Sequence, residues 1–342
     1  MLRQSLLYLS QSPAAKKLIT GTPISRRMAE RFVAGETLDD AVAAARACNE
    51  QGLAVSLDYL GEAVATREEA EEATGMAIRI LERIKEEGLE GNLSIKPTQL
   101  GLDLDEEFCR KNIERVLGRA RELGDGEGEI FVRLDMEGSA YTERTVALVE
   151  SLWANGFHNV GTVLQSYLER TPSDVERLTK LGARVRLVKG AYKEPPEVAF
   201  QDKQDVDRMF VEEMQTLLKT GNYPAIATHD EAMIDATRRY AFENGIDKTS
   251  FEFQMLYGIR RDLQQRLREE GYNVRVYIPF GESWYPYLMR RMAERPANVV
   301  FVTGSVLKES PVGRVAKPVA VGAGIVAGAL ATLAWRGRRN GK

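Results

Sequence analysis

Short runs of β-branched and aliphatic residues alternate along this chain with longer charged segments of helical period, and this alternation restricts the fold more than any other feature. The apolar runs predict eight strands, at residues 53–60, 92–100, 129–137, 159–165, 184–190, 224–229, 250–256 and 273–279. Apolar residues recur every three or four positions between them, which predicts helices that include residues 66–87, 105–123, 141–154 and 206–219. Repeated strand–helix units of this kind indicate a parallel sheet.

Eight strand–helix units are the number that closes a parallel sheet into a barrel, so we predict an α/β fold of the (βα)8 TIM type. An open doubly wound sheet is the rival fold. It usually carries a G-x-G-x-x-G turn after its first strand, and the sequence at that place is LDYLGEAV. We assign residues 46–305 to the barrel, 1–45 to an N-terminal helical arm and 306–342 to an apolar and basic tail.

The tail contains an uncharged segment, VAVGAGIVAGALATLAW at residues 319–335, with basic residues on both sides. Its length is at the short edge of what spans a bilayer, and its alanines and glycines make it only weakly hydrophobic. We expect this segment to contact a membrane, which would place a cytoplasmic protein at the inner face of the cell membrane. A flexible or self-associating tail is the alternative. The first residues of the chain do not predict a secretory signal.

Charge and composition exclude several classes of function. A net charge of −3 gives no basic surface for nucleic acid. Cys48 and Cys109 lie far apart in helical, charge-rich segments, so we expect reduced thiols in a cytoplasmic protein. The two histidines, His158 and His229, have no metal-binding spacing, and we predict no metal site. The sequence does not indicate an oligomeric state.

Polar side chains stand at the predicted C-terminal end of every strand, the end at which barrel enzymes build their sites. In chain order these residues are Asp58, Lys96, Asp135, Gln165, Lys189, His229, Gln254 and Tyr277. Charged residues in parallel strands are costly when they are merely buried. A wet barrel mouth would explain one such residue, but eight together predict a polar active site.

The segment after the eighth strand predicts a helix at residues 283–295 that bears a pair of arginines. Tyr287, Arg290, Arg291 and Glu294 fall on neighbouring parts of one helix face. Two adjacent guanidinium groups suit the binding of a carboxylate, because each can pair with it in a bidentate manner. A solvated basic helix face is the alternative.

Taken in order, the segments IKPTQLG, VRLDMEG, RVRLVKGAY, ATHD, FEFQMLYG, VRVYIPFG and WYPYLMRRMAERPAN resemble one family. They are similar to the monofunctional bacterial proline dehydrogenases and to the dehydrogenase domain of the bifunctional proline utilisation proteins, from about residue 20 to residue 305. The resemblance implies an FAD-dependent oxidoreductase that converts L-proline to Δ1-pyrroline-5-carboxylate by hydride transfer from proline C5 to flavin N5. It also implies a quinone as electron acceptor and a place at the first step of proline catabolism to glutamate.

The resemblance further implies a role for individual residues. Asp135 and Arg186 match the catalytic residues, and Arg186 matches the arginine that approaches flavin N5. The residues that match the proline site are Lys96, Arg290 and Arg291 for the carboxylate, and Tyr192, Leu256, Tyr277 and Tyr287 around the ring. The residues that match flavin contacts are Met136, Gln165, Arg186, Lys189, Gly190, Ala191, Thr228, His229 and Glu294. Lys193 departs from the bifunctional members, which carry an aromatic residue under the adenine.

Three cations around the carboxylate would fix proline from the far side of its ring and offset the cost of enclosing an anion. Three other functions stay open at this point. Lys96 or Lys189 would serve a Schiff-base aldolase as the nucleophile. A flavin barrel of the folate-reductase kind and a non-catalytic, membrane-tethered scaffold are the other two.

Overall fold

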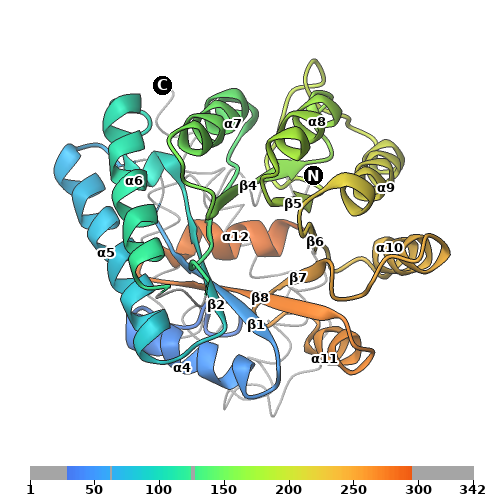
Figure 1. Ribbon diagram of the computed structural model, residues 1–342, viewed down its shortest axis with the longest axis horizontal. Helices are drawn as coiled ribbons and strands as arrows, with labels where there is room; N and C mark the ends of the chain where they lie inside the picture. The colour runs from blue at the N-terminus through green and yellow to red at the C-terminus, as the bar shows by residue number, and fades with distance from the viewer. Residues whose placement is uncertain (1–28, 62–63, 125–127, 295–342) are drawn as a thin grey trace, which may run out of the picture. The chain divides into compact units, whose positions relative to one another are not determined.

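The computed structural model describes residues 29–61, 64–124 and 128–294. Eight parallel strands lie side by side in chain order, and the eighth pairs with the first, so the sheet closes into a barrel (Figure 1). The strands are β1 (Ala54–Tyr59), β2 (Gly91–Ile95), β3 (Val132–Leu134), β4 (Val160–Gln165), β5 (Val185–Val188), β6 (Ala225–Ala227), β7 (Glu252–Leu256) and β8 (Asn273–Phe280). The predicted barrel is therefore confirmed.

Helices follow the strands, as the periodicity predicts. They are α4 (Leu38–Asn49), α5 (Arg67–Glu86), α6 (Glu106–Glu122), α7 (Ser139–Ala154), α8 (Thr171–Leu181), α9 (Lys203–Thr220), α10 (Glu231–Glu243), α11 (Arg261–Glu269) and α12 (Trp284–Glu294). The chain forms two compact units, residues 30–284 and residues 1–29 with 285–342. The barrel belongs to the first unit, whereas α12 from Tyr285 onward belongs to the second.

Helix starts follow the capping residues that the sequence shows. The Thr66 side chain accepts a hydrogen bond from the backbone N–H of Glu69, and the Glu69 carboxylate accepts one from the backbone N–H of Thr66, which is a complete capping box for α5. Asp105 caps α6 in a similar way, through the N–H of Phe108. A glycine directly after a helix predicts a left-handed conformation, and for Gly221 after α9 this prediction is wrong. Its φ is −80°, because the chain leaves α9 in an extended form.

The outer face of the barrel is apolar. Strand residues such as Val55, Leu93, Leu134 and Phe253 are buried together with the inner faces of the surrounding helices in one hydrophobic core. This layer explains why alternate positions in each strand are aliphatic. It leaves the other set of strand positions to face the interior of the barrel.

The interior of the barrel is polar instead. Arg186 on β5 donates to the Ser94 hydroxyl on β2 at 3.2 Å, and these strands are not neighbours in the sheet. A contact between such strands crosses the interior. Barrel interiors are usually filled by branched apolar side chains, so a polar filling marks this part of the molecule as functional.

Two strands end earlier than the apolar runs predict. β2 stops at Ile95, and residues Pro97–Leu100 form a 3-10 turn, because a proline has no N–H for the strand ladder. β3 covers only Val132–Leu134 of the predicted 129–137. The predicted tail, 306–342, and most of the predicted arm, 1–45, lie outside the described residues. Within the described ranges, no helix has the length and apolar character to cross a membrane.

Candidate active site

Arg186 is the centre of the polar interior near the mouth of the barrel. Its Nη1 donates to Asp135 Oδ1 at 2.7 Å, and its Nε donates to Gln254 Oε1. Its Nη2 reaches Ser94, and its guanidinium carbon lies 5.3 Å from the centre of the Tyr277 ring. Arg186 is only 6% exposed, so these contacts compensate for the burial of its charge. The side chain is held in one orientation by four different strands.

Asp135 joins Arg186 to two other predicted site residues. The Tyr277 hydroxyl donates to Asp135 Oδ2 at 2.8 Å, and Lys96 Nζ lies 4.0 Å from the same oxygen. Burial of its hydroxyl and the neighbouring Asp135 carboxylate raise the pKa of Tyr277 well above its usual range, so Tyr277 remains a neutral donor. The structure thus brings four residues of the predicted site, Lys96, Asp135, Arg186 and Tyr277, into one network, and their roles stay a prediction.

Lys96 also pairs with Asp58, at 2.7 Å between Nζ and Oδ1. Asp58 is fully buried, and this burial raises its pKa, while the ammonium group of Lys96 opposes that shift. A buried lysine and a buried aspartate lower the cost of enclosing one another's charge. Asp58 therefore holds Lys96 in place beside Asp135.

A second polar layer lies below this network, toward the N-terminal ends of the strands. Arg275 Nε donates to both Glu252 oxygens, at 3.0 and 3.1 Å, and Glu252 accepts from the Gln254 side-chain amide. Gln254 in turn accepts from Arg186. A continuous chain of polar contacts therefore runs from Arg275 to the mouth of the barrel.

The rim of the barrel on the β4–β7 side carries several of the predicted flavin contacts. Lys189 Nζ pairs with Asp207 at 2.5 Å and with Asp230 at 2.7 Å. His229 Nε2 accepts the backbone N–H of Leu256 at 2.9 Å, so the imidazole proton is assigned to Nδ1. These contacts orient Lys189 and His229 on adjacent strands.

Neighbouring positions are held by buried backbone and side-chain groups. The Gln165 amide donates to the Glu137 carbonyl at 2.9 Å. Met136 and Thr228 are buried, and Ala191 and Tyr192 are half-buried in the loop that follows β5. Gly190 starts this loop with a φ of +117°, a conformation that favours glycine.

Four predicted site residues, Tyr287, Arg290, Arg291 and Glu294, lie on α12, which belongs to the second unit. Within that helix the Arg291 guanidinium stands 5.0 Å from the centre of the Tyr287 ring. The meeting of this helix face with Lys96 stays a prediction.

Several polar residues of the site were missed by the sequence reasoning. These are Asp58 and Gln254, which were noted only as strand ends, and Ser94, Glu252 and Arg275. A signal for the last three was present, because each stands two positions before a polar strand-end residue. Residues two apart in a strand share a face, so the polar strand ends predict that the layer beneath them also faces the interior.

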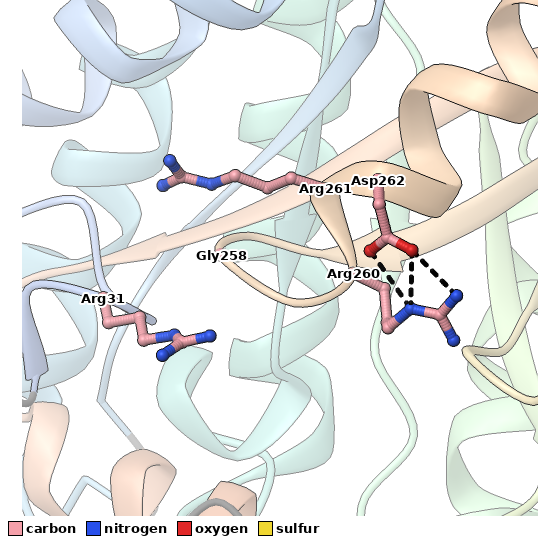
Figure 2. Close-up of a pocket in the computed structure, with 5 residues that line it drawn as sticks. All are labelled: Arg31, Gly258, Arg260, Arg261 and Asp262. Atoms are coloured by element: carbon pink, nitrogen blue, oxygen red, sulfur yellow. Dashed lines mark hydrogen bonds and ion pairs between the residues drawn. The ribbon is translucent and has the colours of Figure 1, made fainter. Parts of the chain in front are cut away.

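A shallow pocket lies at the turn between β7 and α11, and it is distinct from the polar interior. Its lining residues are Arg31, Gly258, Arg260, Arg261 and Asp262. Figure 2 shows Arg260 paired with Asp262, while the guanidinium groups of Arg31 and Arg261 lie apart from that pair. None of the predicted site residues lines this pocket, so we place the candidate active site in the polar interior instead.

Comparison with known proteins identifies the family of this chain. The family model described as proline dehydrogenase matches residues 41–304, which is most of the chain. The chain belongs to the proline dehydrogenase family. Two relatives of this family are a proline dehydrogenase 1 from Bacillus subtilis subsp. natto and a proline dehydrogenase from Deinococcus radiodurans. The chain is 40% identical to the first over 311 residues, covering 90% of this chain and 100% of that protein. It is 41% identical to the second over 310 residues, covering 90% and 98%.

A solved structure supports the same proline dehydrogenase fold. Proline utilization A (PutA) from Bdellovibrio bacteriovorus is 25% identical and superimposes with a TM-score of 0.74. The match covers 90% of this chain and 36% of that one. The family resemblance that the sequence motifs indicate is therefore confirmed.

Proposed function

We propose that this protein is an FAD-dependent proline dehydrogenase that oxidises L-proline to Δ1-pyrroline-5-carboxylate. The observation that carries the proposal is the buried network of Lys96, Asp135, Arg186 and Tyr277 at the mouth of the barrel. These four residues match the family's substrate and catalytic positions, and they meet within one network although they come from four strands. The names of the relatives point to proline as the substrate.

The residues at the rim suit a flavin by their chemistry. The C-terminal ends of the adjacent strands β4, β5 and β6 carry an amide at Gln165, an ammonium group at Lys189 directly after β5 and an imidazole at His229 shortly after β6. Such donors match the carbonyl groups of an isoalloxazine and the charge of a pyrophosphate. We propose that these residues, with Met136 and Arg186, hold FAD. When bound, FAD supplies the two-electron acceptor for hydride from proline C5.

The protein's own side chains bind and orient the substrate. Lys96, with Arg290 and Arg291 from α12, would hold the proline carboxylate, and Tyr277 would lie against the ring. Asp135 fixes both Arg186 and Tyr277, so it sets the positions of a cation and an aromatic ring at once. The ring nitrogen must be neutral when hydride leaves, because its lone pair forms the new C=N bond.

The contacts of the two lysines count against the Schiff-base aldolase. A nucleophilic lysine is usually a desolvated amine or stands beside another cation. Lys96 instead pairs with Asp58, and Lys189 pairs with Asp207 and Asp230. Each lysine is thus paired with carboxylates, as a positively charged ammonium group is, and this supports binding roles for the two lysines.

The electron acceptor and the membrane contact belong to the same proposal. A quinone would take the two electrons and two protons, and the segment 319–335 would bring the protein to the membrane that holds the quinone pool. Fractionation of cells that express the full chain, and a variant that ends at residue 305, tests this step. We expect membrane association only for the full chain, and a full chain found wholly in the soluble fraction would contradict it.

An absorption spectrum before and after addition of L-proline tests the proposed function. We expect a yellow protein whose flavin bands bleach with proline under anaerobic conditions, and a released cofactor that is FAD rather than FMN. A colourless protein that also fails to bind added FAD would refute the proposal. Reduction by a folate substrate and not by proline would favour the other flavin barrel.

A further inference from the structure

The loop between β5 and α9, residues 190–202, is fastened to the barrel at several points, and it carries residues of the proposed site. Gly190 and Ala191 match flavin contacts, and Tyr192 matches a wall of the proline pocket. Gly190 packs on the ring of Tyr167, since a Cβ added at Gly190 would lie 2.4 Å from Tyr167 Cδ1. The Tyr167 N–H also donates to the Lys189 carbonyl at 3.0 Å. The first residue of the loop is therefore fixed.

The far end of the loop is fixed as well. Leu168 and Ala199 form an antiparallel bridge, and the N–H of Phe200 donates to the Tyr167 carbonyl at 2.8 Å. Leu168, Ala199 and Tyr167 form a small buried apolar cluster beneath the loop. The residues between these two ends have no strand or helix of their own. Backbone hydrogen bonds hold the part from Pro195 to Val198, where the Val198 carbonyl accepts the N–H of Glu169 at 3.1 Å, so side-chain contacts matter most for residues 191–194.

Glu194 supplies such a contact in the middle of the loop. Its Oε1 accepts the backbone N–H of Ser139 at 2.8 Å, and its Oε2 is hydrogen-bonded to the Ser139 hydroxyl. The Tyr167 hydroxyl donates to the same carboxylate at 3.4 Å. Ser139 is the first residue of α7, and the preceding N-cap residue, Gly138, has no side chain to cap the helix. Glu194 thus caps α7 from a distant part of the chain, where the positive end of the helix dipole favours a carboxylate.

The position of Ser139 gives this contact its significance. Ser139 follows Asp135 by four residues, and Asp135 pairs with Arg186 on β5. Two contacts therefore connect the chain near the end of β3 with the chain near the end of β5. Arg186 pairs with Asp135 inside the barrel, and Glu194 bonds to Ser139 in the segments that follow the two strands. Pro195 restricts the backbone of Glu194, the residue before it, to extended conformations. Tyr192 is only two residues earlier, so anchoring Glu194 also limits the movement of Tyr192.

We propose that Glu194 is a positioning residue, which holds the β5–α9 loop and with it Gly190, Ala191 and Tyr192 in the geometry that binds flavin and proline. This inference rests on the proposed function. Removal of the carboxylate leaves the barrel folded, because the hydrophobic core does not include Glu194. It frees the middle of the loop and the first turn of α7.

Hydrogen–deuterium exchange of the FAD-loaded Glu194→Ala protein tests whether the contact of Glu194 with Ser139 holds the loop. We expect faster exchange in residues 190–201 and in the first turn of α7, with no change in β1 and β8. We also expect the dissociation constant of FAD and the KM for proline to rise about 3- to 30-fold, the range that loss of a helix cap implies, with a smaller change in kcat. Glu194→Gln should recover most of the loss, because its amide oxygen still accepts from Ser139.

The matched control is Glu197→Ala, which removes an exposed carboxylate from the same loop and should behave as the wild type. Unchanged exchange in Glu194→Ala would show that Glu194 does not hold the loop. Faster exchange with unchanged FAD affinity and KM overturns its positioning role. If the wild type neither binds FAD nor oxidises proline, the proposed function fails, and the same exchange comparison on the proteins without FAD still decides whether Glu194 holds the loop.

Discussion

At the scale of single residues, the site is defined by which buried polar groups are paired. Tyr277 and Arg186 each have a fixed partner in Asp135. Glu213 on α9 is the opposite case, since it is 3% exposed and neither carboxylate oxygen has a hydrogen-bond partner among the described residues. We expect the first kind of residue to serve binding and the second kind to lower stability.

Tyr277→Phe removes the hydroxyl that is bonded to Asp135 and takes away an atom that crowds the proline ring. We expect the preference for proline over hydroxyproline, as the ratio of kcat/KM values, to fall by about 3- to 10-fold. Tyr223→Phe is the control. Tyr223 lies just before β6, at the opposite end of the barrel, and its hydroxyl accepts from the Asn273 side-chain amide at the start of β8. An unchanged ratio in Tyr277→Phe would show that the hydroxyl does not select the substrate.

Glu213→Gln should stabilise the protein above neutral pH. Burial raises the pKa of Glu213 from 4.5 to about 8, so ionisation of this carboxyl opposes folding increasingly as the pH rises from 4.5 and fully above 8. We expect a gain of roughly 1–3 kcal/mol in urea unfolding at pH 8.5 and a smaller gain at pH 5.5. Glu243→Gln, at an exposed position of α10, should give no gain. Equal gains for Glu213→Gln at both pH values would contradict the burial argument.

At the scale of elements, strand–helix alternation was predictable and the ends of the elements were less so. All eight strands appear where the aliphatic runs predict them, because the outer face of the barrel requires those residues for the core. Pro97 shortens β2, and the local apolar pattern outweighed this signal in the prediction. Gly221 ends α9 without a positive φ; the residue with one is Tyr223, two positions later.

The interior pairs were harder to predict than the strands. Lys96, Asp135, Arg186 and Tyr277 were identified through their motifs, but their mutual contacts depend on the register of strands far apart in sequence. The pairing of Arg275 with Glu252, and of Lys96 with Asp58, joins neighbouring strands and depends on the register between them. The spacing of residues in a strand predicts which side chains face the interior of the barrel. The partner that each side chain contacts in the interior is known only from the structure.

The capping box of α5 should contribute measurably to stability. Thr66→Ala removes the acceptor for the Glu69 N–H, and we expect a loss of about 1 kcal/mol in the free energy of unfolding by urea. Thr66→Ser keeps the hydroxyl and should lie close to the wild type. A loss of equal size in both variants would point to packing of the threonine methyl group instead.

At the scale of the whole molecule, the residues predicted to bind the proline carboxylate are divided between the two units of the chain. Lys96 belongs to the barrel unit, and Arg290 and Arg291 belong to the unit that contains α12. We expect Arg290→Ala and Arg291→Ala each to raise the KM for proline by about 10- to 100-fold, the value of a lost charge-assisted hydrogen bond. The flavin content, measured as the ratio of visible to protein absorbance, should not change.

Arg239→Ala is the control for these two variants, because Arg239 is an exposed arginine on α10. Loss of flavin in parallel with the rise in KM would show that the two arginines support the cofactor rather than the substrate. An unchanged KM would remove α12 from the proline site and leave Lys96 without the expected partners.

The polar chain from Arg275 through Glu252 and Gln254 to Arg186 has a consequence for engineering. Buried ion pairs can often be exchanged for well-packed aliphatic residues with no loss, or even a gain, of thermal tolerance. A redesign for higher thermal stability would therefore replace the buried Arg275–Glu252 pair, which lies below the proposed site. Such a redesign would remove the partner of the Gln254 amide, and Gln254 is in turn a partner of Arg186. We therefore expect the more stable protein to have lower activity.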